Sequence, residues 1–389
     1  MADTQLKRTL TLTDLTLFGI TSILGSGGFN FIGKGVGAGG SWWPAAICVA
    51  AVLLMGAAHA YDGAFQRFKQ NTAESDIVRS VFGTWAESAG AIAILAVHLA
   101  NIVVIVVLCS KLIWPTGSWC IQIATTLGFL AAITGTALAG IELNKFVIDG
   151  SSWIIITTLV LASSFAFAGL ATQELTLPAA PTQGGFMSSI LMFFYVFAGF
   201  DALMKFTEEA KDEQDIPRSF YLSILISFVL TAGVSAALSY WTPGLSGVKQ
   251  DNAIGWLFAA FTGPWIVKPF KWLILILMLL TTFVTFLAAS RYLHGLGDKA
   301  EWLAPLKEVN GAAAPWISIL SVFGVGSCVS LINNTDLLVM ITDFGFSVIA
   351  TLVASAVAIA DWRDGSLGSA AVNGATSLGF LGLLGSAFL

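Results

Sequence analysis

Apolar segments of about 18 residues or more recur along the whole 389-residue sequence. A helix of this length crosses the hydrocarbon core of a bilayer, which is about 30 Å thick. Only 11% of the residues are charged, against roughly 25% in soluble domains, so the chain is suited to lipid. The sequence predicts an all-α integral membrane protein with about 11 transmembrane helices, over 11–36, 41–61, 86–112, 117–140, 148–170, 186–207, 218–241, 266–290, 314–332, 336–360 and 367–389.

The connections between these segments are mostly short, which predicts a single membrane domain over residues 1–389. Of the 18 Lys and Arg residues, 13 fall on the side where the chain begins. Because positive charge marks the cytoplasmic side, we expect a multi-pass protein of the plasma membrane or a bacterial inner membrane, with a cytoplasmic N-terminus. The end at Leu389, inside an apolar Gly-rich segment, suggests a truncation. The external loop 242–265 contains a short amphipathic stretch, for which we expect a lid helix.

Two of the apolar segments are interrupted at matching places. The first carries Gly25-Ser26-Gly27-Gly28, and the second carries Ala198-Gly199-Phe200-Asp201. A transmembrane helix gives up backbone hydrogen bonds only where the break lines a cavity or is packed in protein. Interrupted helices at corresponding positions in two halves of a chain indicate the substrate site of a transporter. The paired breaks therefore predict a carrier.

The first break has the chemistry of an anion site. Its glycines free the backbone from helical geometry and leave N–H groups at the start of the next half-helix, an end that binds carboxylates. Ser26 adds a hydroxyl donor. The alternative for this run is close helix packing, which small residues also permit.

The second break places the ionisable Asp201 inside an apolar segment. Such a residue usually faces a cavity or a transport pathway. The alternative is an ion pair with Lys205, four residues further along one helix face. Carbonyls released near Gly199 would point into the same cavity. Together the breaks predict a site for a zwitterion, with its carboxylate at the first break and its amine at the second.

The chain contains four further recognisable stretches in order: LKRTLTLTDLTLFGITSILGSGGF (6–29), LNKFVIDG (143–150), FFYVFAGFDALMKFTEEAKDEQDIPRSF (193–220) and ASRYLHGLGDKAEWLAPLKEVN (289–310). They resemble the first helix with its glycine-rich turn, the start of the fifth helix, the sixth helix, and the end of the eighth helix of the amino acid–polyamine–organocation (APC) superfamily. The sixth-helix stretch is the most specific of the four.

The resemblance implies a five-plus-five inverted-repeat transporter fold with broken helices 1 and 6. The repeats would cover about 11–170 and 186–360, followed by an extra C-terminal helix over about 367–389. Gly28 is also expected among the substrate-binding residues of this turn. It stands where the family has a branched apolar residue, so we expect a wider turn there. The residues that the resemblance places around the substrate are Ile23, Ser26 and Gly27 at the carboxylate, Phe197, Ala198 and Gly199 at the amine, and Tyr195 as an aromatic gate.

Within the superfamily, residues 98–115 are most similar to bacterial basic amino acid antiporters of the arginine/agmatine type. Asn101, with Thr285, then falls at the side-chain end of the substrate, and Asp343 lies near the same end. A buried carboxylate pairs well with a guanidinium or ammonium group, which favours cationic amino acids or polyamines. Alternatively, Asp343 is a proton-linked or structural acid and Asn101 bonds between helices. His98, one turn from Asn101, either lines the cavity or is a hydrogen-bonded core histidine.

Asp201 and Glu208 are the candidates for coupling or gating, together with Tyr195 as the gate. Glu209 is expected at a cytoplasmic helix end. We expect exchange, because residues 153–162 lack the helix-five lysine that drives symport in some relatives. A sodium site would need hydroxyls such as that of Thr285, although threonines in membrane helices more often bond their own backbone.

The sequence contains no Ser/His/Asp set, phosphate loop or metal-spaced cluster. We therefore expect no enzyme, no cofactor and no metal. The net charge of −5 comes without a basic block that would indicate nucleic acid. The expected partners are an amino acid or related amine, the lipid bilayer, and a second copy in a homodimer. The alternative function is a channel-like or non-transporting relative that acts as a sensor or scaffold.

Overall fold

The computed structural model describes residues 6–25, 27–172, 182–241, 252–332 and 334–386. Within these ranges the chain is helical, apart from turns, short connections and one isolated bridge between Leu10 and Ala210. Nine helical stretches of the described chain are long and apolar enough to cross a membrane. The predicted all-α, multi-pass membrane fold is confirmed.

The helices succeed one another along the chain, with short 3-10 helices at several junctions. Their bounds are α1 Leu12–Leu24, α2 Gly27–Gly39, η1 Gly40–Trp42, α3 Trp43–Phe68, α4 Ala73–Phe82, α5 Thr84–Ile113, α6 Trp119–Leu138, α7 Ile141–Thr172, α8 Gln183–Phe197, η2 Phe200–Glu209, α9 Asp215–Trp241, α10 Ala253–Thr262, η4 Pro264–Ile266, α11 Val267–Leu296, η5 Glu301–Lys307, α12 Trp316–Ser330, α13 Thr335–Arg363 and α14 Leu367–Ser386.

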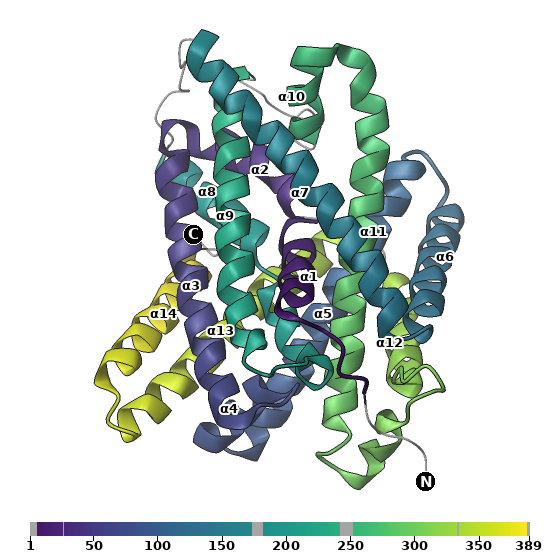
Figure 1. Ribbon diagram of the computed structural model, residues 1–389, viewed down its shortest axis with the longest axis vertical. Coiled ribbons are helices and arrows are strands. Elements are labelled where there is room, and N and C mark those ends of the chain that lie inside the picture. Colours follow the sequence, from purple (N-terminus) through teal and green to yellow (C-terminus); the bar gives the residue numbers. More distant parts are fainter. Residues whose placement is uncertain (1–5, 26, 173–181, 242–251, 333, 387–389) are drawn as a thin grey trace.

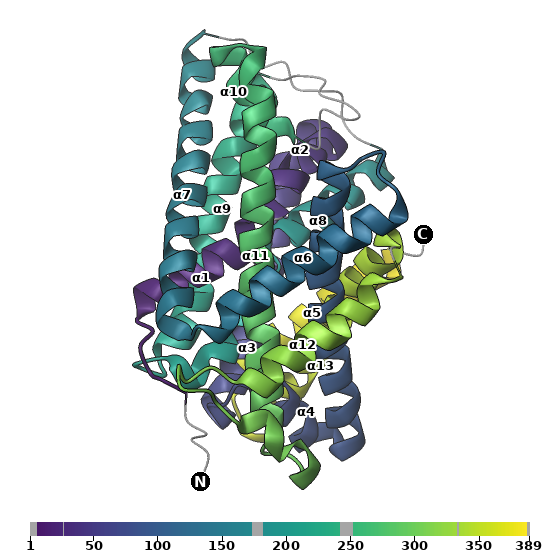
Figure 2. The same cartoon turned by 90° about the vertical axis from the view of Figure 1, so that its right-hand side faces the viewer.

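The long helices stand roughly side by side, with the N-terminus and α4 at one end of the bundle and α10 at the other (Figure 1). We call these the α4 end and the α10 end. The view from the side places α1 at mid-height, to the left of α11 and across α7 and α9 (Figure 2). There α1 packs against α7, α9, α11 and η2, while α2 packs against α8. The two interrupted helices therefore meet at the centre of the bundle.

The eleven predicted segments all appear, but with different bounds. The predicted spans 11–36 and 186–207 are each divided in two, into α1 with α2 and α8 with η2. α3 runs beyond its predicted end at 61, and near its end Arg67 contacts Asp361 of α13 and Asp364, the residue after α13, at 2.8 and 2.7 Å. Helix α4 was not predicted. α10 confirms a helix within the loop 242–265, whose residues 242–251 lie outside the described chain.

The start of α1 is fixed by a capping box. The Asp14 carboxylate accepts from the Thr11 amide at 2.8 Å, while the Thr11 hydroxyl accepts from the Asp14 amide at 3.4 Å. Such reciprocal bonds satisfy donors that the first helical turn leaves free. Lys145 of α7 also contacts the Asp14 carboxylate, at 2.8 Å. The cap and this ion pair hold the half-helix that leads to the first break.

Candidate functional site

The first break begins where α1 ends at Leu24. Gly25 is still helical, and its amide donates to the Thr21 carbonyl at 3.1 Å. A Cβ at Gly25 would collide with the hydroxyl of Thr281, which itself donates to the same Thr21 carbonyl at 3.1 Å. Glycine is therefore required here by the close approach of α11. The predicted break is confirmed, although Ser26 lies outside the described chain.

The second break is centred on Gly199, between α8 and η2. Its φ of +118° is one that side chains rarely adopt, and a Cβ there would lie 2.9 Å from the Ser22 carbonyl oxygen. The Ser22 hydroxyl donates a 2.9 Å hydrogen bond to the Gly199 carbonyl. A single direct bond thus joins the broken helices, from the last turn of α1 to the turn between α8 and η2.

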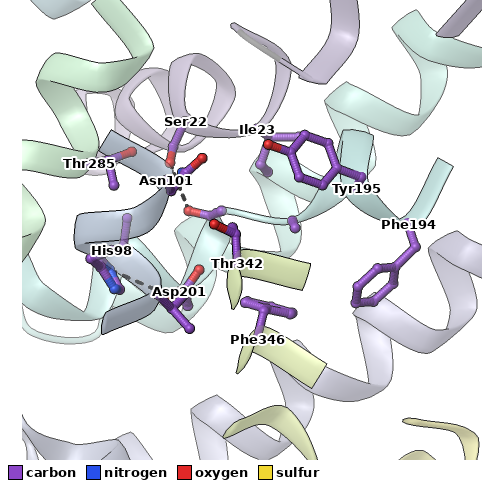
Figure 3. A pocket seen from close by; sticks show the side chains of 14 residues that line it. Ser22, Ile23, His98, Asn101, Phe194, Tyr195, Asp201, Thr285, Thr342 and Phe346 are labelled. Carbon is purple, nitrogen blue, oxygen red and sulfur yellow. Dashed lines mark hydrogen bonds and ion pairs between the residues drawn. The ribbon is translucent and has the colours of Figure 1, made fainter. Parts of the chain in front are cut away.

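A small cavity lies beside this bond (Figure 3). Its volume is about 60 Å³, where one water needs roughly 10–15 Å³, so it holds only a few small atoms. The lining comes from five parts of the fold: Ser22 and Ile23 of α1, Val97, His98 and Asn101 of α5, Phe194, Tyr195, Ala198, Gly199, Asp201 and Ala202 around the second break, Thr285 of α11, and Thr342 and Phe346 of α13.

The structure brings seven of the predicted site residues to this one cavity: Ile23, Asn101, Tyr195, Ala198, Gly199, Asp201 and Thr285. Phe197 is not among the lining residues. Its ring is fully buried and packs 6.3 Å from the ring of Phe228. Gly28 lies in the first turn of α2, where a Cβ would meet only Leu24, at 3.4 Å. Gly27 begins α2, and its surroundings lie outside the described part of the chain.

Two further predicted residues are Glu208 and Asp343. Glu208 is at the far end of η2, where its amide donates to Asn71 at 3.2 Å and its carboxylate lies 3.5 Å from His294. It belongs to the α4 end and does not line the cavity. Asp343 is on α13, one residue after the cavity-lining Thr342, and its side chain lies outside the described part of the chain.

The sequence reasoning missed several lining residues, among them Ser22, Phe194, Thr342 and Phe346. A signal existed for the last two, because residues four apart share one face of a helix. We predicted Asp343 because of its charge, whereas the described residues of α13 that line the cavity are Thr342 and Phe346. His98 fulfils both of its predicted alternatives, since it lines the cavity and bonds the Ile94 carbonyl at 2.9 Å.

Threonine hydroxyls near the first break are engaged by backbone carbonyls. Thr282 donates to Met278 at 2.9 Å and Thr285 donates to Thr281 at 3.3 Å, each one turn back along α11. These are the local bonds typical of threonine in membrane helices. Among the described residues, no group of three His, Cys, Asp or Glu side chains could hold a metal ion.

Between the cavity and the α4 end, buried ion pairs connect η2 to neighbouring helices. Lys205 of η2 pairs with Glu74 of α4, and both side chains are buried. At the end of η2, Glu209 binds Arg291 of α11 through two bonds of 3.0 and 3.1 Å, with neither side chain exposed. Glu209 does lie at a helix end, as expected, but its carboxylate is buried and ties η2 to α11.

The alternative of an Asp201–Lys205 pair assumed an α-helix. Residues 200–209 form a 3-10 helix instead, with three residues per turn. Side chains four apart then point about 120° away from each other. Lys205 accordingly faces Glu74 on α4, whereas Asp201 faces the cavity and lies 3.8 Å from His98.

Comparison with known proteins gives one informative similarity. The chain is 25% identical over 291 residues to the branched-chain amino acid permease BcaP of Bacillus subtilis (strain 168). The chain is thus similar to an amino acid permease. The aligned region covers 67% of this chain and 61% of the relative, so the chain spans less than two thirds of that protein. This similarity supports the resemblance to the APC superfamily. No family model matches the chain.

Proposed function

We propose that this chain is a secondary active amino acid transporter that works by alternating access. The observation that carries the proposal is the Ser22–Gly199 bond, which brings both broken helices to one small cavity, lined by polar and apolar side chains, inside a membrane bundle. In the proposed complex, free N–H groups of the first break bind the substrate carboxylate. The carbonyls near Ala198 and Gly199 bind its amine. The similarity to a permease supports the same function.

The substrate's side chain is proposed to be apolar and branched. Phe194 and Tyr195 line both the small cavity and a second pocket of about 520 Å³ between α2, α8, α13 and α14. That pocket is lined mainly by apolar residues such as Leu191, Val339 and Ile341. A side chain too large for the small cavity would enter this pocket if the two aromatic rings rotate. The relative is named for branched-chain amino acids.

The second candidate is a cationic substrate, carried by an exchanger of the arginine/agmatine type. It rests on Asp343, which follows the cavity-lining Thr342 on α13. If Asp343 reaches the substrate, Asp343→Asn will abolish discrimination between L-arginine and L-leucine. The competing proposal expects this substitution to leave the preference for L-leucine unchanged.

Counterflow in proteoliposomes tests the function. Vesicles preloaded with one unlabelled amino acid are given the same amino acid with a radioactive label, across a panel that includes L-leucine and L-arginine. The proposal predicts saturable uptake that the internal amino acid stimulates. Flux that rises linearly with concentration, without stimulation, would instead indicate a channel. No flux beyond protein-free vesicles would indicate a sensor or scaffold.

The proposed transport cycle uses the inverted-repeat architecture that the resemblance implies. The repeats 11–170 and 186–360 would rock around the central breaks, with 367–389 outside them. The N-terminus would be cytoplasmic, and Tyr195 would gate the cavity, since its ring already packs against Phe31 of α2 at 4.4 Å. A homodimer remains part of the proposal.

A further inference from the structure

Two titratable side chains of the cavity, those of His98 and Asp201, lie close together, and no hydrogen is available between them when the His98 ring is neutral. His98 and Asp201 both line the cavity, and both side chains are largely buried. His98 Nδ1 lies 2.9 Å from the Ile94 carbonyl oxygen. Because a carbonyl can only accept, this nitrogen carries the hydrogen, and Nε2 of a neutral ring then has a lone pair.

That lone pair faces a second acceptor. Nε2 lies 3.8 Å from the Asp201 carboxylate oxygen Oδ2. A neutral imidazole in this tautomer offers the carboxylate no hydrogen, and the two acceptors repel each other. A proton on Nε2 converts the contact into an ion pair, and charges at such a distance interact strongly away from water. The direct contact is therefore attractive when the pair holds one proton.

The surrounding charges leave Asp201 without a fixed counter-ion. Lys205 is the nearest cation on the same helix, but it is paired with Glu74 of α4. The other oxygen of Glu74, Oε2, is buried without a hydrogen-bond partner among the described residues. The cluster thus contains two carboxylates and one lysine. The cation of this cluster contacts Glu74 and not Asp201.

Further titratable groups face this cluster from the elements packed around it. On α4, Asp76 is paired with Lys299, and burial with the nearby carboxylates of Asp201 and Asp76 raises the pKa of Glu74 to about 7, although Lys205 opposes this. The remaining described groups are the phenols of Tyr61 on α3 and Tyr292 on α11. Asp343 follows the cavity-lining Thr342 on α13, and its side chain lies outside the described part of the chain. α6 and α12, which also pack on α5, carry no Asp, Glu, Lys, Arg or His.

We propose that His98 and Asp201 bind one proton between Nε2 and Oδ2, and that the ammonium group of the substrate displaces it. This inference rests on the proposed function for the identity of the competitor. A proton on His98 and an ammonium beside Asp201 are two like charges sharing one carboxylate, so binding of one weakens binding of the other. Each substrate that binds releases about one proton to the solution. Import of the substrate is then linked to export of a proton.

Nuclear magnetic resonance on the ¹⁵N-histidine-labelled full chain in nanodiscs tests the proton site without substrate. The chain has three histidines, so His98→Gln identifies the His98 signals by their loss. The proposal predicts that His98 is an imidazolium at pH 6 in the wild type and neutral at the same pH in Asp201→Asn. A His98 ring that stays neutral from pH 5 to pH 8 overturns the proposal.

The displacement is tested by adding L-leucine at pH 6 and recording both the His98 signals and the protons released. The matched control is His294→Gln. His294 has the same arrangement, with Nδ1 3.3 Å from the Leu306 carbonyl and Nε2 3.5 Å from Glu208, but it lies outside the cavity. We expect about one proton per leucine in wild type and His294→Gln, and none in His98→Gln. Glu74→Gln should retain the release but move it to lower pH.

The outcomes separate the two proposals. If leucine shows counterflow at equal pH but leaves His98 protonated, the displacement is wrong and transport stands. If no amino acid shows counterflow, the proposed function fails, while the titration of His98 still decides the proton site. If Glu74→Gln abolishes proton release at every pH and His98→Gln retains it, the proton belongs to Glu74 and the proposal is overturned.

Discussion

The turn at Gly199 is the position where we expect one added methyl group to be most destabilising. An alanine there must adopt a φ of +118°, which costs an L-residue about 1–2 kcal/mol. Its Cβ would also lie 2.9 Å from the Ser22 carbonyl oxygen and 3.0 Å from its hydroxyl oxygen. Overpacking of this kind costs about 1–3 kcal/mol. Gly199→Ala therefore carries a penalty of about 2–5 kcal/mol in the closed arrangement.

The molecule relieves this penalty only by separating the two breaks. Because the cavity is built on their contact, we expect L-leucine binding to weaken by at least 30-fold, the equivalent of about 2 kcal/mol. The assay is scintillation proximity binding on purified protein, with the thermal midpoint measured in parallel. The midpoint should fall with the affinity, since the same contact holds α1 to the second break.

Gly28→Ala is the matched control, because it adds the same methyl group near the other break. There the new Cβ would touch only Leu24, at 3.4 Å, in the first turn of α2. Alanine favours a helix over glycine by about 0.5–1 kcal/mol, so affinity and thermal midpoint should be retained. The reasoning is refuted if Gly199→Ala binds and melts like Gly28→Ala, or if the control is equally damaged.

Three further predictions concern the Ser22 bond and the buried ion pairs. Ser22→Ala removes the hydroxyl that binds the Gly199 carbonyl and should weaken L-leucine binding about 2–10-fold, as expected for about 0.5–1.5 kcal/mol; unchanged affinity would count against the bond. Arg291→Ala leaves the Glu209 carboxylate buried and unpaired, at about 3–5 kcal/mol, so folded yield in fluorescence-detected size exclusion should collapse. The double variant Arg291→Met with Glu209→Leu should recover it, and failure to recover would show that the charges are needed for more than mutual neutralisation. Burial raises the pKa of Glu74 in the folded protein from 4.5 to about 7. The stability that Glu74 contributes is therefore fully present below about pH 4.5 and is lost as the pH rises through 7. The thermal midpoint in detergent should fall across this window and fall less steeply in Glu74→Gln, whereas a midpoint that rises with pH would contradict the assignment.

Local features of the sequence predict much of the architecture. The apolar runs are long enough to specify membrane helices wherever they occur, and the glycines at 25, 27, 28 and 199 mark where two of them stop. The resemblance of the first helix and of residues 98–115 placed Ile23 and Asn101 at one cavity, where the structure also has them.

What the sequence could not give depends on rotation and on distant partners. The 3-10 winding of η2 turns Lys205 away from Asp201, and an α-helical reading cannot foresee this. The partner of Glu209 is Arg291, 82 residues further along the chain, so its burial has no local signature. Ser22 lies one residue from the predicted Ile23, but its role depends on the approach of Gly199.

The central claim is that the two breaks bind the two ends of one zwitterion. Displacement of labelled L-leucine by L-leucine, its methyl ester and N-acetyl-leucine tests this most directly, because each derivative blocks one end and leaves the side chain intact. The account predicts that unlabelled L-leucine displaces the label and that both derivatives fail at concentrations at least 100-fold higher. Displacement by the ester or the N-acetyl compound at concentrations similar to that of leucine would contradict it.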